Sequence, residues 1–327
     1  MSTHISVQNL TKQYQVHQKE PGFIGSIRSF FNRKYEYVTA VNDISLEIAE
    51  GEMVGFLGPN GAGKTTTLKV LSGLLYPTSG QATVMGYTPH EREYDYLRQM
   101  TLVMGNKNQL IWDLPASESF LVNKAIYEIP DDEYNKTLAQ FDEILDLKPL
   151  LNKQVRKLSL GERMKCELAA SLLHKPKILF LDEPTLGLDV TMQVAIRNFI
   201  SAYNEQHKAT IILTSHYMAD VTALTQRIIV IHNGRLLYDG NLQELIAQVA
   251  PYKLLSLTLR HDTTAEALTP YGQVEKLDGH KAILRVPRGQ GMQTASQILQ
   301  TLAVDDLLIE EPPIEDIIRQ VFADGIT

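Results

Sequence analysis

A glycine-rich loop carries the clearest chemistry in this chain. The loop and the residues after it are Gly58, Pro59, Asn60, Gly61, Ala62, Gly63, Lys64, Thr65 and Thr66. An apolar strand pattern over 53–57 precedes the loop and a helical pattern over 65–71 follows it, so backbone N–H groups and the positive end of the helix dipole face one point. Lys64 is then placed to reach the β- and γ-phosphates, and Thr65 to ligate Mg²⁺. The loop predicts a nucleoside triphosphate site.

Two acids directly follow a short apolar run over 178–181. Asp182 and Glu183 would lie at the carboxyl end of a central parallel strand, beside the phosphate loop. Asp182 suits the Mg²⁺ shell, and Glu183 suits polarisation of the water that attacks the γ-phosphate. The alternative is an ordinary acidic strand end, which the phosphate loop upstream disfavours.

Two further groups point to the same chemistry. His216 ends the next predicted strand, over 210–214, at the same sheet edge, and we expect it to contact the γ-phosphate. Ser159 and Gly161 lie where a helix begins and predict a second anion site. Ser159 with Glu162 three residues later also fits a simple capping box.

The order of elements predicts how these residues are positioned. Strand patterns at 53–57, 178–181, 210–214 and 228–231 alternate with helical stretches, which argues for a parallel α/β sheet with ligands at its carboxyl edge. A mostly helical region covers about 116–174. Asn233-Gly234 predicts a hairpin. Residues 252–327 then form a small α+β domain, after a linker helix over 241–251.

Composition limits the classes of protein. The chain has 327 residues, 44% of them hydrophobic and 21% charged, and a net charge of −7, which is weak evidence against a nucleic-acid partner. Cys166 is the single cysteine, so no intrachain disulfide is possible. No signal-peptide pattern and no run of about 18 apolar residues occurs. We therefore expect a cytoplasmic protein whose membrane role comes through a partner.

These motifs, in this order, resemble the ATP-binding subunit of ABC transporters over about residues 1–240. The resemblance implies a P-loop NTPase cassette, an α/β fold with a mixed sheet core and a helical subdomain at about 106–174. It makes Gly58–Thr66 the Walker A loop, Asp182 the end of Walker B, Glu183 the catalytic base and His216 the switch histidine. Tyr14 corresponds to the aromatic that stacks on adenine, Leu158–Glu162 to the signature motif and Asp189 to the D-loop.

The resemblance also implies partners and location. Two cassettes pair head to tail, as a homodimer or a heterodimer, with each ATP between one Walker A loop and the partner's Ser159 and Gly161. With Mg²⁺ bound, hydrolysis would drive an integral-membrane permease, which holds the chain at the cytoplasmic face of the membrane. The chain looks most like exporter-type subunits that carry a C-terminal extension.

The chain departs from the family pattern at three places. Leu160 and Glu162 replace the usual third and fifth signature residues, although Ser159 and Gly161 are kept. The Q-loop metal ligand falls on Asn106 or on Gln109. An insertion at about 18–37 has an amphipathic, basic helix pattern over 21–34, which predicts either docking on the permease or bilayer or packing on the cassette itself.

Two other classes are weighed against this one. A soluble ABC ATPase of translation or DNA repair is the alternative, but such chains usually carry two cassettes or a long coiled-coil arm, for which this chain has no room. A GTPase is rejected because the sequence Asn106-Lys107-Asn108-Gln109 lacks the final aspartate of a guanine-reading motif.

Overall fold

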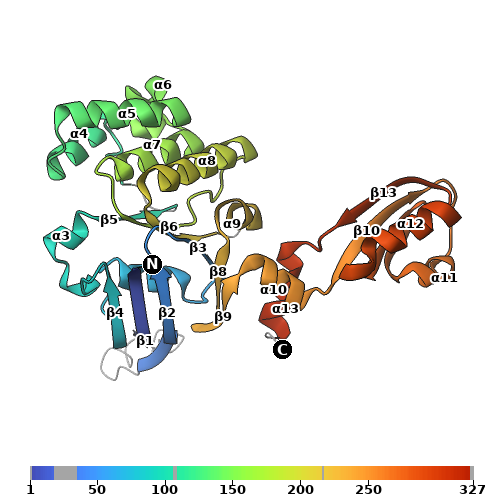
Figure 1. Ribbon diagram of the computed structural model, residues 1–327. Coiled ribbons are helices and arrows are strands. Elements are labelled where there is room, and N and C mark those ends of the chain that lie inside the picture. The colour runs from blue at the N-terminus through green and yellow to red at the C-terminus, as the bar shows by residue number, and fades with distance from the viewer. Residues whose placement is uncertain (1, 18–34, 106–108, 216, 325–327) are drawn as a thin grey trace, which may run out of the picture. The chain divides into compact units, whose positions relative to one another are not determined.

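The computed structural model describes residues 2–17, 35–105, 109–215 and 217–324 (Figure 1). The chain divides into two compact units, Met1–Asp239 and Gly240–Thr327.

A six-stranded sheet forms the centre of the first unit, in the order β5-β6-β7-β3-β8-β9. Its strands are β3 (Met53–Leu57), β5 (Met100–Met104), β6 (Ile178–Asp182), β7 (Thr210–Thr214), β8 (Arg227–His232) and β9 (Arg235–Asn241). The first five strands in this order, β5, β6, β7, β3 and β8, are parallel to one another. Every residue of β6 and β7 is buried, as expected for parallel strands covered on both faces. The predicted parallel α/β sheet is confirmed.

The strand register sets which residues meet at the carboxyl edge. Met104 of β5 pairs with Asp182 of β6, and Asp182 pairs with Thr214 of β7. The three strands therefore end level with one another, so the residues just beyond them emerge along one line.

A three-stranded antiparallel sheet, in the order β2-β1-β4, covers the helix that follows the glycine loop. It consists of β1 (Thr3–His17), β2 (Tyr35–Ala49) and β4 (Ser79–Val84), and the helix is α2 (Lys64–Leu71). Its inward side chains, such as Ile5 and Ile44, are fully buried in one apolar cluster with Phe56 and Leu68. This cluster packs α2 against the central sheet. The short helix α3 (Tyr94–Leu97) leads into β5.

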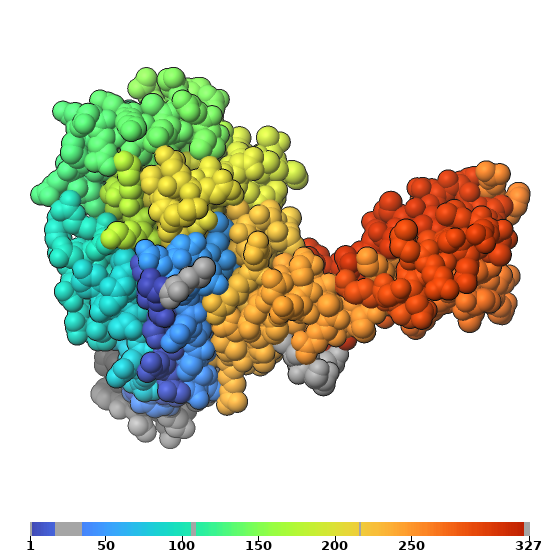
Figure 2. Space-filling model, in the orientation of Figure 1, coloured from blue at the N-terminus to red at the C-terminus, as the bar shows by residue number. Residues whose placement is uncertain are grey.

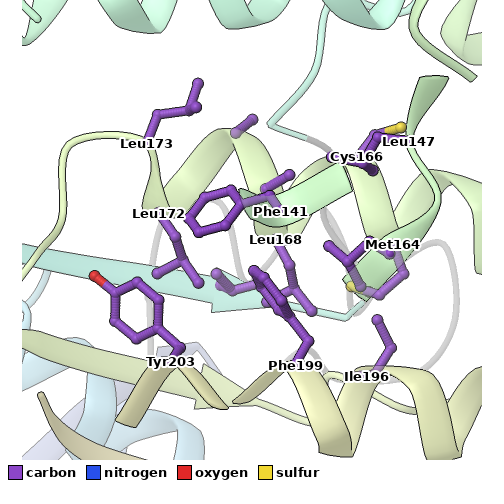
Figure 3. Close-up of a cluster of buried hydrophobic side chains, with 14 of the residues drawn as sticks. Phe141, Leu147, Met164, Cys166, Leu168, Leu172, Leu173, Ile196, Phe199 and Tyr203 are labelled. Carbon is purple, nitrogen blue, oxygen red and sulfur yellow. The ribbon is translucent and has the colours of Figure 1, made fainter. Parts of the chain in front are cut away.

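Helices form a further layer of the first unit, which Figure 2 shows as the green to yellow surface at the top. They are α4 (Ala116–Ile126), α5 (Asp131–Leu145), α6 (Lys148–Leu151), α7 (Leu160–Leu172) and α8 (Val190–His207). The short helix α9 (Met218–Leu224) lies lower in the view and contacts α8 and β3 (Figure 1). Phe141 of α5 meets Phe199 of α8 edge to face, with ring centroids 5.1 Å apart, and Leu168 of α7 lies beside them (Figure 3). This shared core joins α7 and α8, the helices whose N-cap residues are Ser159 and Asp189.

The second unit is a small α+β domain. It contains α10 (Leu242–Val249), β10 (Tyr252–Leu259), α11 (Ala265–Leu268), β11 (Gln273–Asp278), β12 (Lys281–Pro287), α12 (Gly291–Thr301), β13 (Val304–Glu310) and α13 (Ile314–Asp324). Its antiparallel sheet has the order β11-β12-β10-β13. Leu255 and Leu257 of β10 and Leu284 of β12 are buried in one cluster with Ile298 of α12, so α12 covers one face.

Two findings bear on membrane contact. Within the part of the chain that the structure describes, no helix is long and apolar enough to cross a bilayer. The predicted amphipathic helix over 21–34 lies outside the described residues, and residues 35–37 of the insertion begin β2.

Candidate active site

Glycine is required at two positions of the loop between β3 and α2 because other backbone lies too close for a side chain. A Cβ at Gly58 would lie 2.2 Å from the carbonyl oxygen of Ile231, and one at Gly63 would lie 2.4 Å from that of Ala40. Gly63 also has a φ of 107°, a left-handed value that favours glycine. Gly61 has a φ of 80° and no atom within 4 Å of its added Cβ, so this part of the loop borders open space.

Lys64 lies inside the loop rather than extending into solvent. Its side chain is 5% exposed, and Nζ donates to the carbonyl oxygens of Gly58 (2.5 Å) and Pro59 (3.1 Å). Burial lowers the pKa of Lys64, and the nearby carboxylates of Glu183 and Asp182 act against that shift. The ammonium group is thus held at the mouth of the loop, next to both acids. Asn60 of the loop is exposed, and Thr66 of α2 is half-buried.

A cluster of oxygen atoms lies where α2, β6 and β7 meet. The Thr65 hydroxyl donates to the two carboxylate oxygens of Asp182 at 2.9 and 3.1 Å. The Thr214 hydroxyl donates to the same carboxylate at 2.7 Å. Asp182 is 8% exposed, so this carboxylate lies at a buried rim with hydroxyl groups on two sides.

This donor set fits Mg²⁺. Hydroxyl and carboxylate oxygens are hard ligands, and Mg²⁺ in phosphate sites usually takes only one or two carboxylates and completes its shell with phosphate oxygens and water. Among the described residues no group of three or more histidines, cysteines and acids could hold a metal on its own. Thr65 and Asp182 therefore suit a metal that arrives with a phosphate ligand.

Glu183 is held in an unusual backbone conformation beside this cluster. Its φ is 55°, in the left-handed region that non-glycine residues seldom occupy. Its N–H donates to the carbonyl and hydroxyl oxygens of Thr214, both at 3.1 Å. On the other side, the N–H of Gly105 donates to the carbonyl of Asp182 at 2.9 Å. Both neighbouring strands thus fix the turn that carries the Glu183 carboxylate.

The start of α7 forms a complete capping box. The Ser159 hydroxyl accepts from the N–H of Glu162 at 3.2 Å, and the Glu162 carboxylate accepts from the N–H of Ser159 at 2.8 Å. The hydrogen bond from the Ser159 N–H lowers the pKa of Glu162, and a second one, donated by the Lys153 ammonium at 3.0 Å, lowers it further. The unusual glutamate in the signature motif therefore has a structural reason.

The signature segment lies against the first turn of α8 and the loop before it. A Cβ at Gly161 would lie 2.6 Å from Cγ of Met192, and one at Gly187 would lie 3.1 Å from Cδ2 of Leu160. Asp189 is the N-cap of α8 and accepts from the N–H of Met192 at 2.9 Å. The predicted anion-site residues Ser159 and Gly161 thus lie near the D-loop of the same chain.

Four other predicted residues lie apart from the oxygen cluster or outside the described residues. Tyr14, on β1, is half-buried, with the Lys12 ammonium 5.5 Å from its ring centroid. The Gln109 amide donates to the carbonyl of Leu102 on edge strand β5 at 2.7 Å. Asn106 and His216 lie outside the described residues.

Sequence reasoning missed two contributors. The Thr214 hydroxyl bonds to Asp182, and its place at the end of a strand level with Asp182 was the available signal. Glu167, in the middle of α7, was not singled out. It is 3% exposed and accepts from the N–H of Gln109 at 2.8 Å and of Leu110 at 3.4 Å. Burial raises the pKa of Glu167, and those N–H groups act against the shift.

The glycine loop, its lysine and the Thr65–Asp182 pair define the class as a P-loop nucleotide-binding protein. Residues 41–186 match the ABC transporter family, and residues 251–310 match the family described as "EvrA-like ABC transporter, C-terminal domain". The ABC transporter ATP-binding protein NatA of Bacillus subtilis (strain 168) is 35% identical over 215 residues, which cover 66% of this chain and 87% of that protein. The bacitracin transport ATP-binding protein BcrA of Bacillus licheniformis is 33% identical over 239 residues, covering 73% of this chain and 70% of that protein.

The chain therefore belongs to the ATP-binding subunits of ABC transporters. The fold agrees with that assignment. The dimeric, post-hydrolysis structure of the ATP-binding cassette MJ0796 bound to ADP and Pi superposes with a TM-score of 0.59 at 24% identity, covering 72% of this chain and 98% of that one. The subunit binds nucleotide and belongs to a family of ATPases.

Proposed function

We propose that this chain hydrolyses ATP to drive a separate integral-membrane permease, and that the transporter is an exporter. The observation that carries the proposal is the meeting of Lys64, Thr65 and Asp182 at one sheet edge, with Glu183 directly beyond. The relative named for bacitracin transport supports the exporter assignment.

Each residue at this edge has a role in the proposed reaction. Lys64 and the loop N–H groups hold the β- and γ-phosphates in line. The Glu183 carboxylate takes a proton from a water whose oxygen bonds to the γ-phosphorus, while the bond from that phosphorus to the β–γ bridging oxygen breaks. ADP and inorganic phosphate leave. A positioned base of this kind contributes about 10²–10⁴-fold. His216 contacts the γ-phosphate.

Three further groups complete the proposed nucleotide site. Thr65 and Asp182 would hold Mg²⁺, whose charge would offset that of the phosphate oxygens. Asn106 or Gln109 would supply an additional metal contact. Tyr14 stacks on the adenine ring, and its half-buried position on β1 leaves one part of the ring accessible.

We expect two such chains to pair head to tail around two ATP molecules. Ser159, Gly161 and Asp189 of one chain would then meet the nucleotide on the other. A helix N-terminus with a hydroxyl group is a suitable phosphate site. The chain carries every residue of a complete site, which favours a homodimer over a heterodimer.

An exposed apolar surface on the helical layer suits the permease. Ile111, Trp112 and Leu114 are 42%, 46% and 40% exposed in the segment before α4, and Leu121 and Ile126 of α4 are 46% and 59% exposed. Contiguous exposed apolar side chains mark interaction sites. A permease bound here would place the ATPase at the cytoplasmic face of the membrane.

Two substitutions test the site, and one purification tests the partner. We expect Glu183→Gln to abolish turnover, keep ATP binding and trap a dimer, whereas Lys64→Ala should lose ATP binding. Wild-type turnover by Glu183→Gln would contradict the role of Glu183. Purification from native membranes in mild detergent should yield a stoichiometric multi-span protein by mass spectrometry. Ribosomal or DNA-repair partners in its place would favour the soluble alternative.

A further inference from the structure

A fully buried carboxylate on α9 connects three separate segments of the first unit. Asp220 is 0% exposed, and one of its oxygens accepts from the hydroxyls of Thr185 and Ser215, the latter at 2.7 Å. Its other oxygen accepts from Arg197 of α8 at 2.9 Å. A buried charge is costly unless it is paired and hydrogen-bonded, and these partners satisfy both oxygens.

The segments that meet at Asp220 carry the proposed catalytic groups. Thr185 lies two residues after Glu183, and Ser215 directly precedes His216 in the sequence. The Ser215 hydroxyl also accepts from the N–H of Tyr217 at 3.0 Å, so the residues on both sides of position 216 are fixed to the same centre.

We propose that Asp220 is a positioning residue for ATP hydrolysis, which rests on the function proposed above. Through Thr185 it fixes the turn that aims the Glu183 carboxylate, and through Ser215 it fixes the end of β7, whose Thr214 accepts from the N–H of Glu183. Arg197 holds the charge of Asp220 in place from α8. Because Asp220 is fully buried, it acts through these partners and not by direct contact with ATP or water.

The hydroxyl of Thr185 separates a positioning role from simple packing. Thr185 is 1% exposed, and Thr185→Val keeps nearly the same side-chain shape while removing the donor to Asp220. Thr185→Ser keeps the donor and removes a methyl group instead. Loss of packing should therefore affect the serine variant, whereas loss of positioning should affect the valine variant.

The experiment measures ATP hydrolysis by the purified full-length chain and five variants. They are Asp220→Asn, Thr185→Val, Thr185→Ser, the control Glu52→Gln and the reference Glu183→Gln. Glu52 pairs with Arg227 at 3.1 Å just before β3, at the opposite end of the strand from the site. Its substitution breaks a partly buried ion pair without touching the catalytic loops.

We expect Asp220→Asn and Thr185→Val to lower kcat by about 10- to 100-fold while KM for ATP stays within about threefold, because small misplacements of a catalytic group have effects of this size. Thr185→Ser should keep at least about half of the wild-type kcat, since it retains the positioning donor. Glu52→Gln should lower Tm and leave kcat unchanged.

Two results would overturn the proposal: a wild-type kcat for Thr185→Val, or a loss of kcat that follows Tm alike in Asp220→Asn and Glu52→Gln. The reference variant keeps the two hypotheses separate. Normal turnover by Glu183→Gln would reject Glu183 as the base whatever Asp220 does. In that case, a loss of kcat in Asp220→Asn and Thr185→Val would mean that Asp220 positions a different catalytic group in the same loops.

Discussion

Replacing Gly105 by alanine would move the proposed general base without changing it. A Cβ at Gly105 would lie 2.2 Å from the carbonyl oxygen of Glu183, and ordinary contact begins at 3.4 Å. The backbone of Glu183 would therefore have to retreat by about 1 Å, because this close neighbour is backbone rather than a flexible side chain. Gly105 is not among the residues with positive φ, so the alanine itself is compatible with the local backbone.

The expected effect follows from that displacement. A misplacement of about 1 Å can lower the rate about 10²-fold, which corresponds to about 2.7 kcal/mol in the barrier. The crowding should also cost about 1–3 kcal/mol of folding stability. We expect kcat to fall about 10²-fold and ATP affinity to change little, because the glycine loop and Lys64 follow β3, which is not a neighbour of β5 in the sheet.

The assay is steady-state ATP hydrolysis with kcat and KM determined separately, together with Tm. Gly289→Ala is a matched control, since no atom lies within 4 Å of its added Cβ and it lies in the second unit. A Gly105→Ala protein with kcat within twofold of wild type would refute the claim that the turn at Glu183 is fixed by its neighbours.

Two further predictions concern the core of the helical layer. Burial lowers the pKa of His174 to about 4 from 6.5, so the unfolded chain takes up a proton first as the pH falls, and stability is lost between about pH 6.5 and 4. Linkage puts that loss of stability at about 1.4 kcal/mol at pH 5.5. His174→Phe, which can keep the stack on Tyr127, should remove this loss when the free energy of unfolding is compared at pH 7.5 and 5.5. If the pH dependence of unfolding were the same in the variant, His174 would not be its source. Cys166 is 0% exposed and burial raises its pKa to about 12, so iodoacetamide should label it only after unfolding in guanidinium, and rapid labelling of the folded chain would contradict its burial.

The strands that carry the site could be predicted because their interior residues are apolar and polar side chains occur only at their ends. Segments 178–182 and 210–214 are buried at every position, and uninterrupted apolar runs are typical of central parallel strands. The edge strands β11 and β13 were not predicted. Their residues are largely exposed or half-buried, with polar side chains such as Glu275 and Asp306, so the period-2 pattern is weak.

The long-range contacts of the site could not be predicted. Asp220 meets partners 35 and 23 residues earlier, and only the assembled sheet brings them together. Nothing in the sequence around Gly105 indicates that the carbonyl oxygen of Glu183, 78 residues later, lies beside it. The roles of Asn106 and His216 stay predictions, because these two residues lie outside the described chain.

The strand order has a consequence for synthesis of the chain. β3, which leads into the glycine loop, is made early, but its neighbours in the sheet are β7 and β8, which end at residues 214 and 232. Domains fold as units while the ribosome extends the chain at about 5–20 residues per second. The nascent β3 therefore waits about 10–30 s with both edges unpaired, and such edges can pair with other chains. Translation that stalls before residue 232 would leave an aggregation-prone fragment. Nearly the whole cassette must therefore emerge before β3, the strand that leads into the glycine loop, is paired on both edges.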